Sequence, residues 1–313
     1  MLRHSEPRTL PSAGSVGGVD VGWSQVRASS AAAKIEWDQK RIWLDVKRFR
    51  AIEPDRTHVL GLVFDAPMLV ASFDGPLTTG LMPATNYRVA ERLLTSGFQP
   101  RIGKPGQSSS PNGRRLNAEA TECAKIIIRR RLVGRAHHAE NIHSLAIVEA
   151  FPTSFLGVLL PDPTGLKTRR RASSDVFYET LSSLGILNGL IQELLPARSV
   201  SFDFEEFRNH DDRAAIVCAL SSLCVAAGRY TAVGDNDGWI ILPPFDWIAP
   251  WAHEIFVTNG RRLAALEISP KLGPKLGLMT SMFPEMSLEE FNATDDEIAK
   301  MFEGSSIEPT SSP

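Results

Sequence analysis

The feature that most constrains the fold is a single acidic residue inside a short apolar stretch near the start of the chain. Residues 16–24 read VGGVDVGWS, so Asp20 stands between two valines, with glycines on both sides. Successive side chains of a strand point to opposite faces, which separates Val19 and Val21 from Asp20. The stretch therefore predicts a strand. Asp20 either accepts hydrogen bonds from backbone amides at a turn or belongs to a site that includes further carboxylates.

Composition indicates an ordinary folded protein with no global attraction to nucleic acid or lipid. The chain has 313 residues, 43% hydrophobic and 22% charged, with a formal net charge of −2. Any binding to phosphate backbones must therefore rely on local basic patches. We expect one domain over residues 16–244, between a disordered tail at 1–15 and an extension at 245–284 packed on the domain. Residues 285–313 should be a mostly disordered acidic, Ser/Pro-rich tail.

Cysteine usage and hydropathy bear on the compartment. Cys123, Cys218 and Cys224 cannot all pair and have no CxxC spacing, so we interpret them as reduced core thiols. The first residues lack the apolar run of a signal peptide, and the longest later apolar run, 214–227, is too short to cross a bilayer. We expect a cytoplasmic protein without membrane contact, whose oligomeric state stays open.

The first half of the chain should form strands, and one of them carries a second acid. Residues 34–37 and 41–49 are rich in β-branched and aromatic residues and should continue the 16–24 strand as an antiparallel meander. The apolar run 59–67, VLGLVFDAP, suits a strand buried on both faces. Since Pro67 cannot donate to a ladder, Asp65 would lie at the strand's carboxyl end, where it could be catalytic or cap a turn.

Basic residues gather in the middle of the chain, and several could contact an anionic substrate. Residues 69–85 should be a loop, 86–96 a short helix, and 103–115 and 168–173 flexible basic loops. Residues 117–131 should be a helix with a basic last turn. On the 86–96 helix, a surface ion pair is the alternative interpretation of its charged pair. The candidate substrate-binding residues are Arg88, Glu91, Lys104, Arg114, Arg115, Arg169 and Arg170.

Further acids follow in the second half of the chain. Glu149 interrupts the apolar strand candidate 145–151, where an unpaired charge would be costly. Asp211 and Asp212 open a helix of small and apolar residues, and there they either cap the helix or face the sheet. That helix is apolar nearly all round, so its periodicity does not say which of Asp211 and Asp212 faces the sheet. A long helix at 175–195 and a hairpin at 229–242 complete the pattern.

Together these acids predict a metal site. Clustered carboxylates raise one another's pKa unless a cation is present. Hard oxygen ligands without cysteine or well-spaced histidine favour Mg²⁺ or Mn²⁺. We predict that the ligands and catalytic groups are Asp20, Asp65, Glu149 and either Asp211 or Asp212.

An ordered series of motifs resembles a known family. The segments GVDVGWS, VFDAPML, YRVAERLL, VEAFPTSF and HDDRAAIVCALSSL, followed by GDNDGWIILPP, resemble the domain of unknown function family 429, a group of predicted RNase H-like nucleases. The resemblance covers residues 16–244. It implies an α/β fold with an RNase H-like mixed sheet, an antiparallel three-strand meander plus parallel strands, flanked by helices. In one departure, Ala214 stands where an aspartate is expected.

The function that these observations predict is metal-dependent hydrolysis of nucleic acid phosphodiesters. One alternative is a nucleotide-dependent phosphotransferase of the actin-like and sugar-kinase type, because Asp20, Gly22 and Ser24 resemble the phosphate-binding turn of those proteins. Against it, no second glycine-rich phosphate loop and no duplicated core can be identified in the sequence. A second alternative is a catalytically inactive nucleic-acid-binding module, which Ala214 favours.

Overall fold

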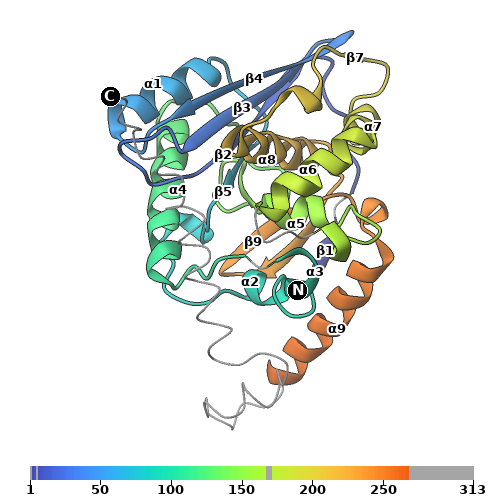
Figure 1. The fold of residues 1–313 in the computed structure, drawn as a ribbon. Coiled ribbons are helices and arrows are strands. Elements are labelled where there is room, and N and C mark those ends of the chain that lie inside the picture. The colour runs from blue at the N-terminus through green and yellow to red at the C-terminus, as the bar shows by residue number, and fades with distance from the viewer. Residues whose placement is uncertain (1, 5, 104, 167–170, 268–313) are drawn as a thin grey trace, which may run out of the picture. The chain divides into compact units, whose positions relative to one another are not determined.

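The computed structural model describes residues 2–4, 6–103, 105–166 and 171–267, with side chains as far as residue 262 (Figure 1). They form an α/β fold around a mixed sheet of nine strands in the order β1-β8-β9-β6-β5-β2-β3-β4-β7. The strands are β1 (Leu2–His4), β2 (Gly14–Asp20), β3 (Ser30–Trp37), β4 (Arg41–Phe49), β5 (Ala71–Asp74), β6 (Ile147–Ala150), β7 (Ser199–Val200), β8 (Thr231–Asp235) and β9 (Gly238–Leu242).

The centre of the sheet combines the predicted meander with parallel strands. β2, β3 and β4 pair antiparallel, β5 lies parallel to β2 on its other side, and β6 lies parallel to β5. The predicted meander and the β6 strand are therefore confirmed, and so is the predicted hairpin, because β8 and β9 pair antiparallel. Because β2, β5 and β6 run in the same direction, their carboxyl ends meet at one edge of the sheet.

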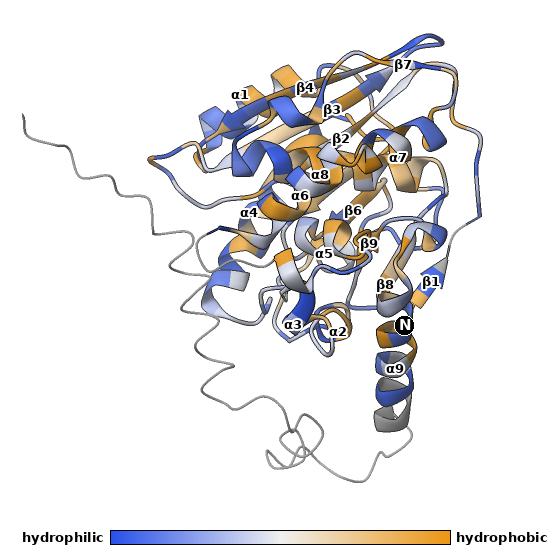
Figure 2. Cartoon of the chain, turned by 45° about the vertical axis from the view of Figure 1, so that its right-hand side comes forward, coloured by the Kyte–Doolittle hydropathy of each residue, from blue (hydrophilic) through white to orange (hydrophobic). Residues whose placement is uncertain are grey.

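Helices cover both faces of the sheet. The helices are α1 (Glu53–Val63), α2 (Val89–Leu93), α3 (Gln99–Ile102), α4 (Pro111–Arg129), α5 (Pro152–Gly157), α6 (Ser173–Ser183), α7 (Ile186–Leu194), α8 (His210–Ala226) and α9 (Pro250–Glu267). Helix α8 is buried from Arg213 to Val225 and largely hydrophobic (Figure 2). It packs directly on β2, where a Cβ at Gly18 would lie 2.1 Å from the backbone nitrogen of Ala219. Only glycine permits this approach.

The opposite face of β2 is covered by the segment around α1. A Cβ at Gly17 would lie 2.7 Å from Phe64 and Met68, which follow that helix. Gly17 and Gly18 are neighbours in a strand, so their contacts identify the two faces. We call the side of Gly18 the α8 face and the side of Gly17 the α1 face.

The prediction of a strand over residues 59–67 is wrong, because residues 59–63 belong to helix α1. The helix has Pro54 in its first turn, together with the acidic residues Glu53 and Asp55, and these features favour a helix start. Its buried residues Val59, Leu60 and Val63 follow a helical spacing. The actual strand, β5, lies within residues 69–85, which were predicted to be a loop.

Other predicted boundaries also differ from the structure. The long helix expected at 175–195 is two helices, α6 and α7, separated at Gly185, which has a φ of 69°. The N-terminal tail contains β1, which pairs antiparallel with β8. Helix α4 begins at Pro111, so it includes the end of the expected 103–115 loop.

The chain divides into two compact units, Met1–Gly260 and Arg261–Pro313. In the second unit, the structure describes only the end of α9, so most of the expected extension and the whole 285–313 tail lie outside the described residues. Within the described part of the chain, no helix is both long and apolar enough to cross a membrane.

Candidate functional site

Two aspartates lie side by side at the carboxyl edge of the central sheet. Asp20 is the last residue of β2 and Asp74 is the last residue of β5, and the two are direct partners in the parallel register. Neighbouring strands are about 4.8 Å apart, and paired side chains project from the same face. Asp20 lies two residues after Gly18, so both carboxylates belong to the α8 face.

Helix α8 brings Asp211 to the same face. The side of α8 that contacts β2 includes Ala215, Ala219 and Ser222, whose hydroxyl donates to the Gly17 carbonyl at 2.6 Å. Asp211 is four residues before Ala215 and therefore continues this stripe towards the helix start. Capping does not explain this acid, because Asn209 accepts hydrogen bonds from the backbone amides of residues 211 and 212.

Asp212 lies beside Asp211 and has a basic partner on β4. The guanidinium of Arg48 is 3.5 Å from the Asp212 carboxylate, and the Arg48 side chain is 48% exposed. Arg48 pairs with Ala31, which pairs with Asp20, so it lies on the same face two strands away from Asp20. We call Asp20, Asp74, Asp211 and Asp212 the acid cluster.

His210, the first residue of α8, also lies near the acid cluster. Its Nδ1 atom is 3.1 Å from the Asp175 carboxylate. Burial opposes protonation of this ring, but the hydrogen bond with Asp175 and the charges of Asp175, Asp211 and Asp74 outweigh it and raise the pKa of His210.

Simultaneous ionisation of all four carboxylates of the acid cluster is unfavourable. Burial raises the pKa of Asp20 well above its ordinary value, and the charges of Asp74, Asp211 and Asp212 raise it further. Burial raises the pKa of Asp74 to about 7, although the positive charge of His210 opposes the shift. Burial also raises the pKa values of Asp211 and Asp212. A bound cation would relieve this repulsion.

Glu149 lies on the other face of the sheet and has a complete set of partners. It pairs in register with Phe73, one residue before Asp74, so its side chain projects from the α1 face. Arg88 donates from Nη1 to one carboxylate oxygen and from Nη2 to the other, both at 2.7 Å. Arg88 also donates from Nε to Glu91 at 2.8 Å. We call Arg88, Glu91 and Glu149 the Arg88 network.

The structure therefore brings only some of the predicted ligands together. Asp20 and Asp211 share the α8 face with Asp212, whereas Glu149 belongs to the Arg88 network. Asp65 does not end a strand. It follows α1, its side chain is 62% exposed, and its carboxylate is 2.7 Å from the Lys34 amine. Lys34 pairs in register with Gly17, so its side chain projects from the α1 face.

The predicted substrate-binding residues are also dispersed. Arg88 and Glu91 are each only 1% exposed, so they do not present a surface to a ligand in this conformation. Arg114 and Arg115 are exposed residues near the start of α4. Lys104, Arg169 and Arg170 lie outside the described residues.

Sequence reasoning missed Asp74, Arg48 and Asn209. A signal for Asp74 was present, because Asp74-Gly75-Pro76 repeats the acid, small residue and proline of 65–67 nine residues later. The preceding apolar residues of β5 are too few for a clear periodicity. The positions of Arg48 and Asn209 became meaningful only once the strand register and the helix start were known.

The donor chemistry of the acid cluster fits a hard divalent cation. Its members supply carboxylate oxygens alone, and their pKa values are raised by burial and mutual repulsion. Among the side chains that the structure describes, no three His, Cys, Asp or Glu residues are arranged closely enough to hold a metal ion. The fit therefore lies in the donor type and the charge.

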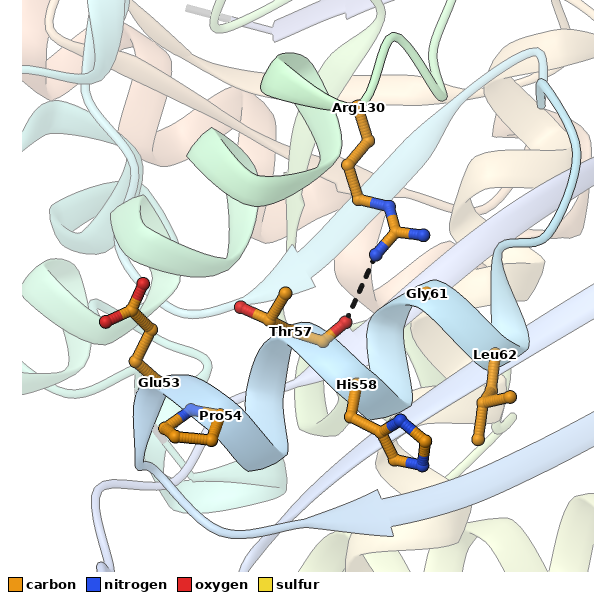
Figure 3. Close-up of a pocket in the computed structure, with 7 residues that line it drawn as sticks. All are labelled: Glu53, Pro54, Thr57, His58, Gly61, Leu62 and Arg130. Atoms are coloured by element: carbon orange, nitrogen blue, oxygen red, sulfur yellow. Dashed lines mark hydrogen bonds between the residues drawn. The ribbon is translucent and has the colours of Figure 1, made fainter.

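A separate hollow lies over α1, away from the acid cluster. It has a volume of about 500 Å³ and is lined by Glu53, Pro54, Thr57, His58, Gly61, Leu62 and Arg130 (Figure 3). Arg130 donates to the Thr57 carbonyl at 3.4 Å across it. Its lining mixes acidic, basic and apolar groups and includes no member of the acid cluster.

Comparison with known proteins yields no relative: no family model matches the chain, and no curated protein or solved structure matches it.

Proposed function

We propose that this chain is a divalent-metal-dependent nuclease of the RNase H-like type, with Mg²⁺ or Mn²⁺ bound by Asp20, Asp74 and Asp211. The observation that carries the proposal is the pairing of Asp20, which is buried, with the partly exposed Asp74 at the ends of adjacent parallel strands, with Asp211 on the helix that covers the same face. The catalytic site of open α/β sheets is usually found at this edge.

The architecture supports the proposal at a coarser level. An antiparallel meander joined to parallel strands, with helices on both faces, is the arrangement that the resemblance to the predicted RNase H-like family implies. In this proposal Asp74 takes the ligand position that the sequence assigned to Asp65. Glu149 is not required as a ligand.

Each member of the acid cluster has a role in the proposal. Asp20 and Asp74 bind the ion from the sheet, and Asp211 binds it from the helix one turn before Ala214. When bound there, a divalent ion would activate a water for attack on phosphorus and would stabilise the negative charge of the leaving oxygen. Arg48 is exposed on the same face and binds the substrate phosphate through charge-assisted hydrogen bonds. Asp212 orients the Arg48 guanidinium through their ion pair.

The decisive experiment compares two aspartates in similar sequence contexts, Asp65-Ala66-Pro67 and Asp74-Gly75-Pro76. Cleavage of single-stranded and double-stranded DNA and RNA should be measured with Mn²⁺, with Mg²⁺ and with EDTA. Asp74→Asn should reduce cleavage by more than about 100-fold, because it removes a ligand, whereas a change in a residue that only supports a ligand typically costs about 10- to 100-fold. Asp65→Asn is the matched control and should keep native activity, since Asp65 contacts Lys34 on the α1 face.

Four outcomes would contradict the proposal. Cleavage that persists in EDTA would exclude the metal mechanism, and equal activity of Asp74→Asn and the native chain would exclude the site. Thermal stabilisation by ATP without cleavage would favour the phosphotransferase alternative. Binding of nucleic acid without turnover would favour the inactive module.

A further inference from the structure

The turn that follows Asp74 is held by buried side chains on the α1 face. The Leu77 amide donates to Glu149 at 2.7 Å, and the Leu77 carbonyl accepts from Arg88 at 2.7 Å. The Pro76 carbonyl accepts from Asn117 at 2.8 Å. Leu77 itself is fully buried. Both backbone polar groups of Leu77 are thus fixed by one ion pair.

The Arg88 network uses the hydrogen-bonding capacity of its members. Glu149 accepts at both oxygens, and Glu91 accepts from Arg88 at one oxygen and from the amide and hydroxyl of Ser108 at the other, both at 3.1 Å. A cluster with these contacts has one defined geometry. It offers no oxygen that lacks a donor and could bind an ion or a substrate.

The network also connects the turn to the neighbouring strand. Glu149 belongs to β6, which pairs with β5 so that Glu149 lies opposite Phe73. A hydrogen bond from Leu77 to Glu149 therefore ties the chain just after Asp74 to the strand beside it. The anchor lies three residues after Asp74, which is the last residue of β5 and pairs in register with Asp20.

Stability alone is a poor explanation for such a group. The network buries two carboxylates against one guanidinium, and a buried ion pair is often no more stable than apolar residues of the same size. What the network provides is a defined geometry, because the bidentate hydrogen bonds between Arg88 and Glu149 determine where the backbone attached to them lies.

We propose that Arg88 and Glu149 are positioning residues, which hold the Asp74–Leu77 turn so that Asp74 meets Asp20 at the metal site, and which do not touch the substrate. The inference rests on the proposed function, because it assumes that Asp20 and Asp74 bind the ion. It replaces two predictions from the sequence, namely a substrate contact for Arg88 and a ligand role for Glu149.

The test measures Mn²⁺ binding by calorimetry on the full chain, together with cleavage kinetics. Arg88→Lys keeps the charge but loses the two-pronged contact with Glu149. It should weaken Mn²⁺ binding by about 10- to 100-fold, as changes behind metal ligands do, and leave the substrate KM unchanged. If Glu149 were a ligand, releasing it from Arg88 would leave Mn²⁺ binding unchanged or tighter, and that result would overturn the inference.

Glu149→Gln provides a second variant of nearly the same size. Both oxygens of Glu149 accept from N–H donors, so the amide nitrogen of glutamine must face one of them. Mn²⁺ binding should weaken, and the Leu77 amide should exchange with solvent faster while β6 amides keep native protection. Native exchange at Leu77 in this variant would contradict the inference.

A buried arginine elsewhere supplies the matched control. Arg56 on α1 is 6% exposed and bonds Glu119 on α4. Glu119→Gln also removes a carboxylate from a buried arginine and should leave Mn²⁺ binding native.

Asp74→Asn separates failure of the inference from failure of the proposed function. Native Mn²⁺ binding by Asp74→Asn would overturn the proposed function and with it the inference. Loss of Mn²⁺ binding in Asp74→Asn, with native binding in Arg88→Lys and Glu149→Gln, would overturn the inference alone.

Discussion

Two groups of acids lie on opposite faces of the same sheet and differ in how their charge is balanced. The acid cluster on the α8 face places four carboxylates near one another, with only His210 and the half-exposed Arg48 as nearby positive groups among the described residues. The Arg88 network on the α1 face surrounds one guanidinium with two carboxylates and fills their hydrogen bonds. The first group leaves its repulsion unrelieved, and the second is internally satisfied.

This difference indicates different uses of buried charge. A satisfied network fixes geometry, and its disruption leaves an orphan charge in the core. A cluster of mutually repelling carboxylates lowers the stability of the metal-free protein, and binding of a ligand of opposite charge stabilises that protein most. The predictions below test this contrast, from the largest expected effect to the smallest.

Asp211 and Asp212 should differ most strongly in activity. Asp211 continues the α8 stripe that contacts β2, whereas Asp212 bonds Arg48. Asp211→Asn should lower kcat by more than about 100-fold and Asp212→Asn by less than about 10-fold. Steady-state cleavage with saturating Mn²⁺ measures both. Equal effects would show that the helix does not separate the two roles.

Arg88→Met and Asp20→Asn should change stability in opposite directions. Removing Arg88 leaves Glu149 and Glu91 buried without their partner, and such a loss costs about 3–5 kcal/mol. Asp20→Asn removes one of the repelling charges and should leave stability unchanged or raise it by about 1 kcal/mol. Urea unfolding without metal gives both values. A large loss of stability in Asp20→Asn would mean that the acid cluster is structural.

The stability of the metal-free protein should fall as pH rises from about 4 to about 7. The pKa of Asp74 is about 7 in the folded chain and 3.8 in its ordinary state. The unfolded chain therefore binds fewer protons across this window, so the free energy of unfolding falls with pH, by about 4 kcal/mol for Asp74 alone. Mn²⁺ should remove the fall, and Asp74→Asn should reduce it. A flat profile in the native chain would contradict the raised pKa.

Arg48→Ala should have the smallest effect and should act on substrate binding. The side chain is half exposed, so its removal costs little stability. We expect KM to rise by about 10-fold or less with kcat near native, and the salt dependence of binding to lose about one phosphate contact. Lys47→Ala, an exposed neighbour on β4, is the control. A change in kcat alone would place Arg48 in the chemical step.

Much of the fold was predictable because it depends on local pattern. The β-branched and aromatic runs of β3 and β4 and the DNDG turn between β8 and β9 identify their elements without tertiary information. The segment at 59–67 could not be assigned in this way. Its apolar run is compatible with a strand or a buried helix, and the packing of Val59, Leu60 and Val63 in α1 decided the outcome.

The candidate site was predictable only in part for a related reason. Asp20 and Asp211 could be identified from the sequence because each interrupts or opens an apolar element. Which acids face each other depends on the register between strands that are distant in sequence. Side chains alternate between the two faces of a sheet, so a register shift of one residue moves a side chain to the other face. Glu149 and Asp74 show this directly, because they are offset by one position in paired strands and project from opposite faces.

By itself, the sequence determined that Asp20 is an acid in a strand, with glycines that leave room beside it, and that further acids end or open apolar elements. Only the tertiary structure decided that Asp74 is its partner, that Gly18 admits α8 to the same face, and that Glu149 belongs to Arg88. The physical reason is that the interactions of a charge depend on distance and burial, which the pairing of strands and the packing of helices define.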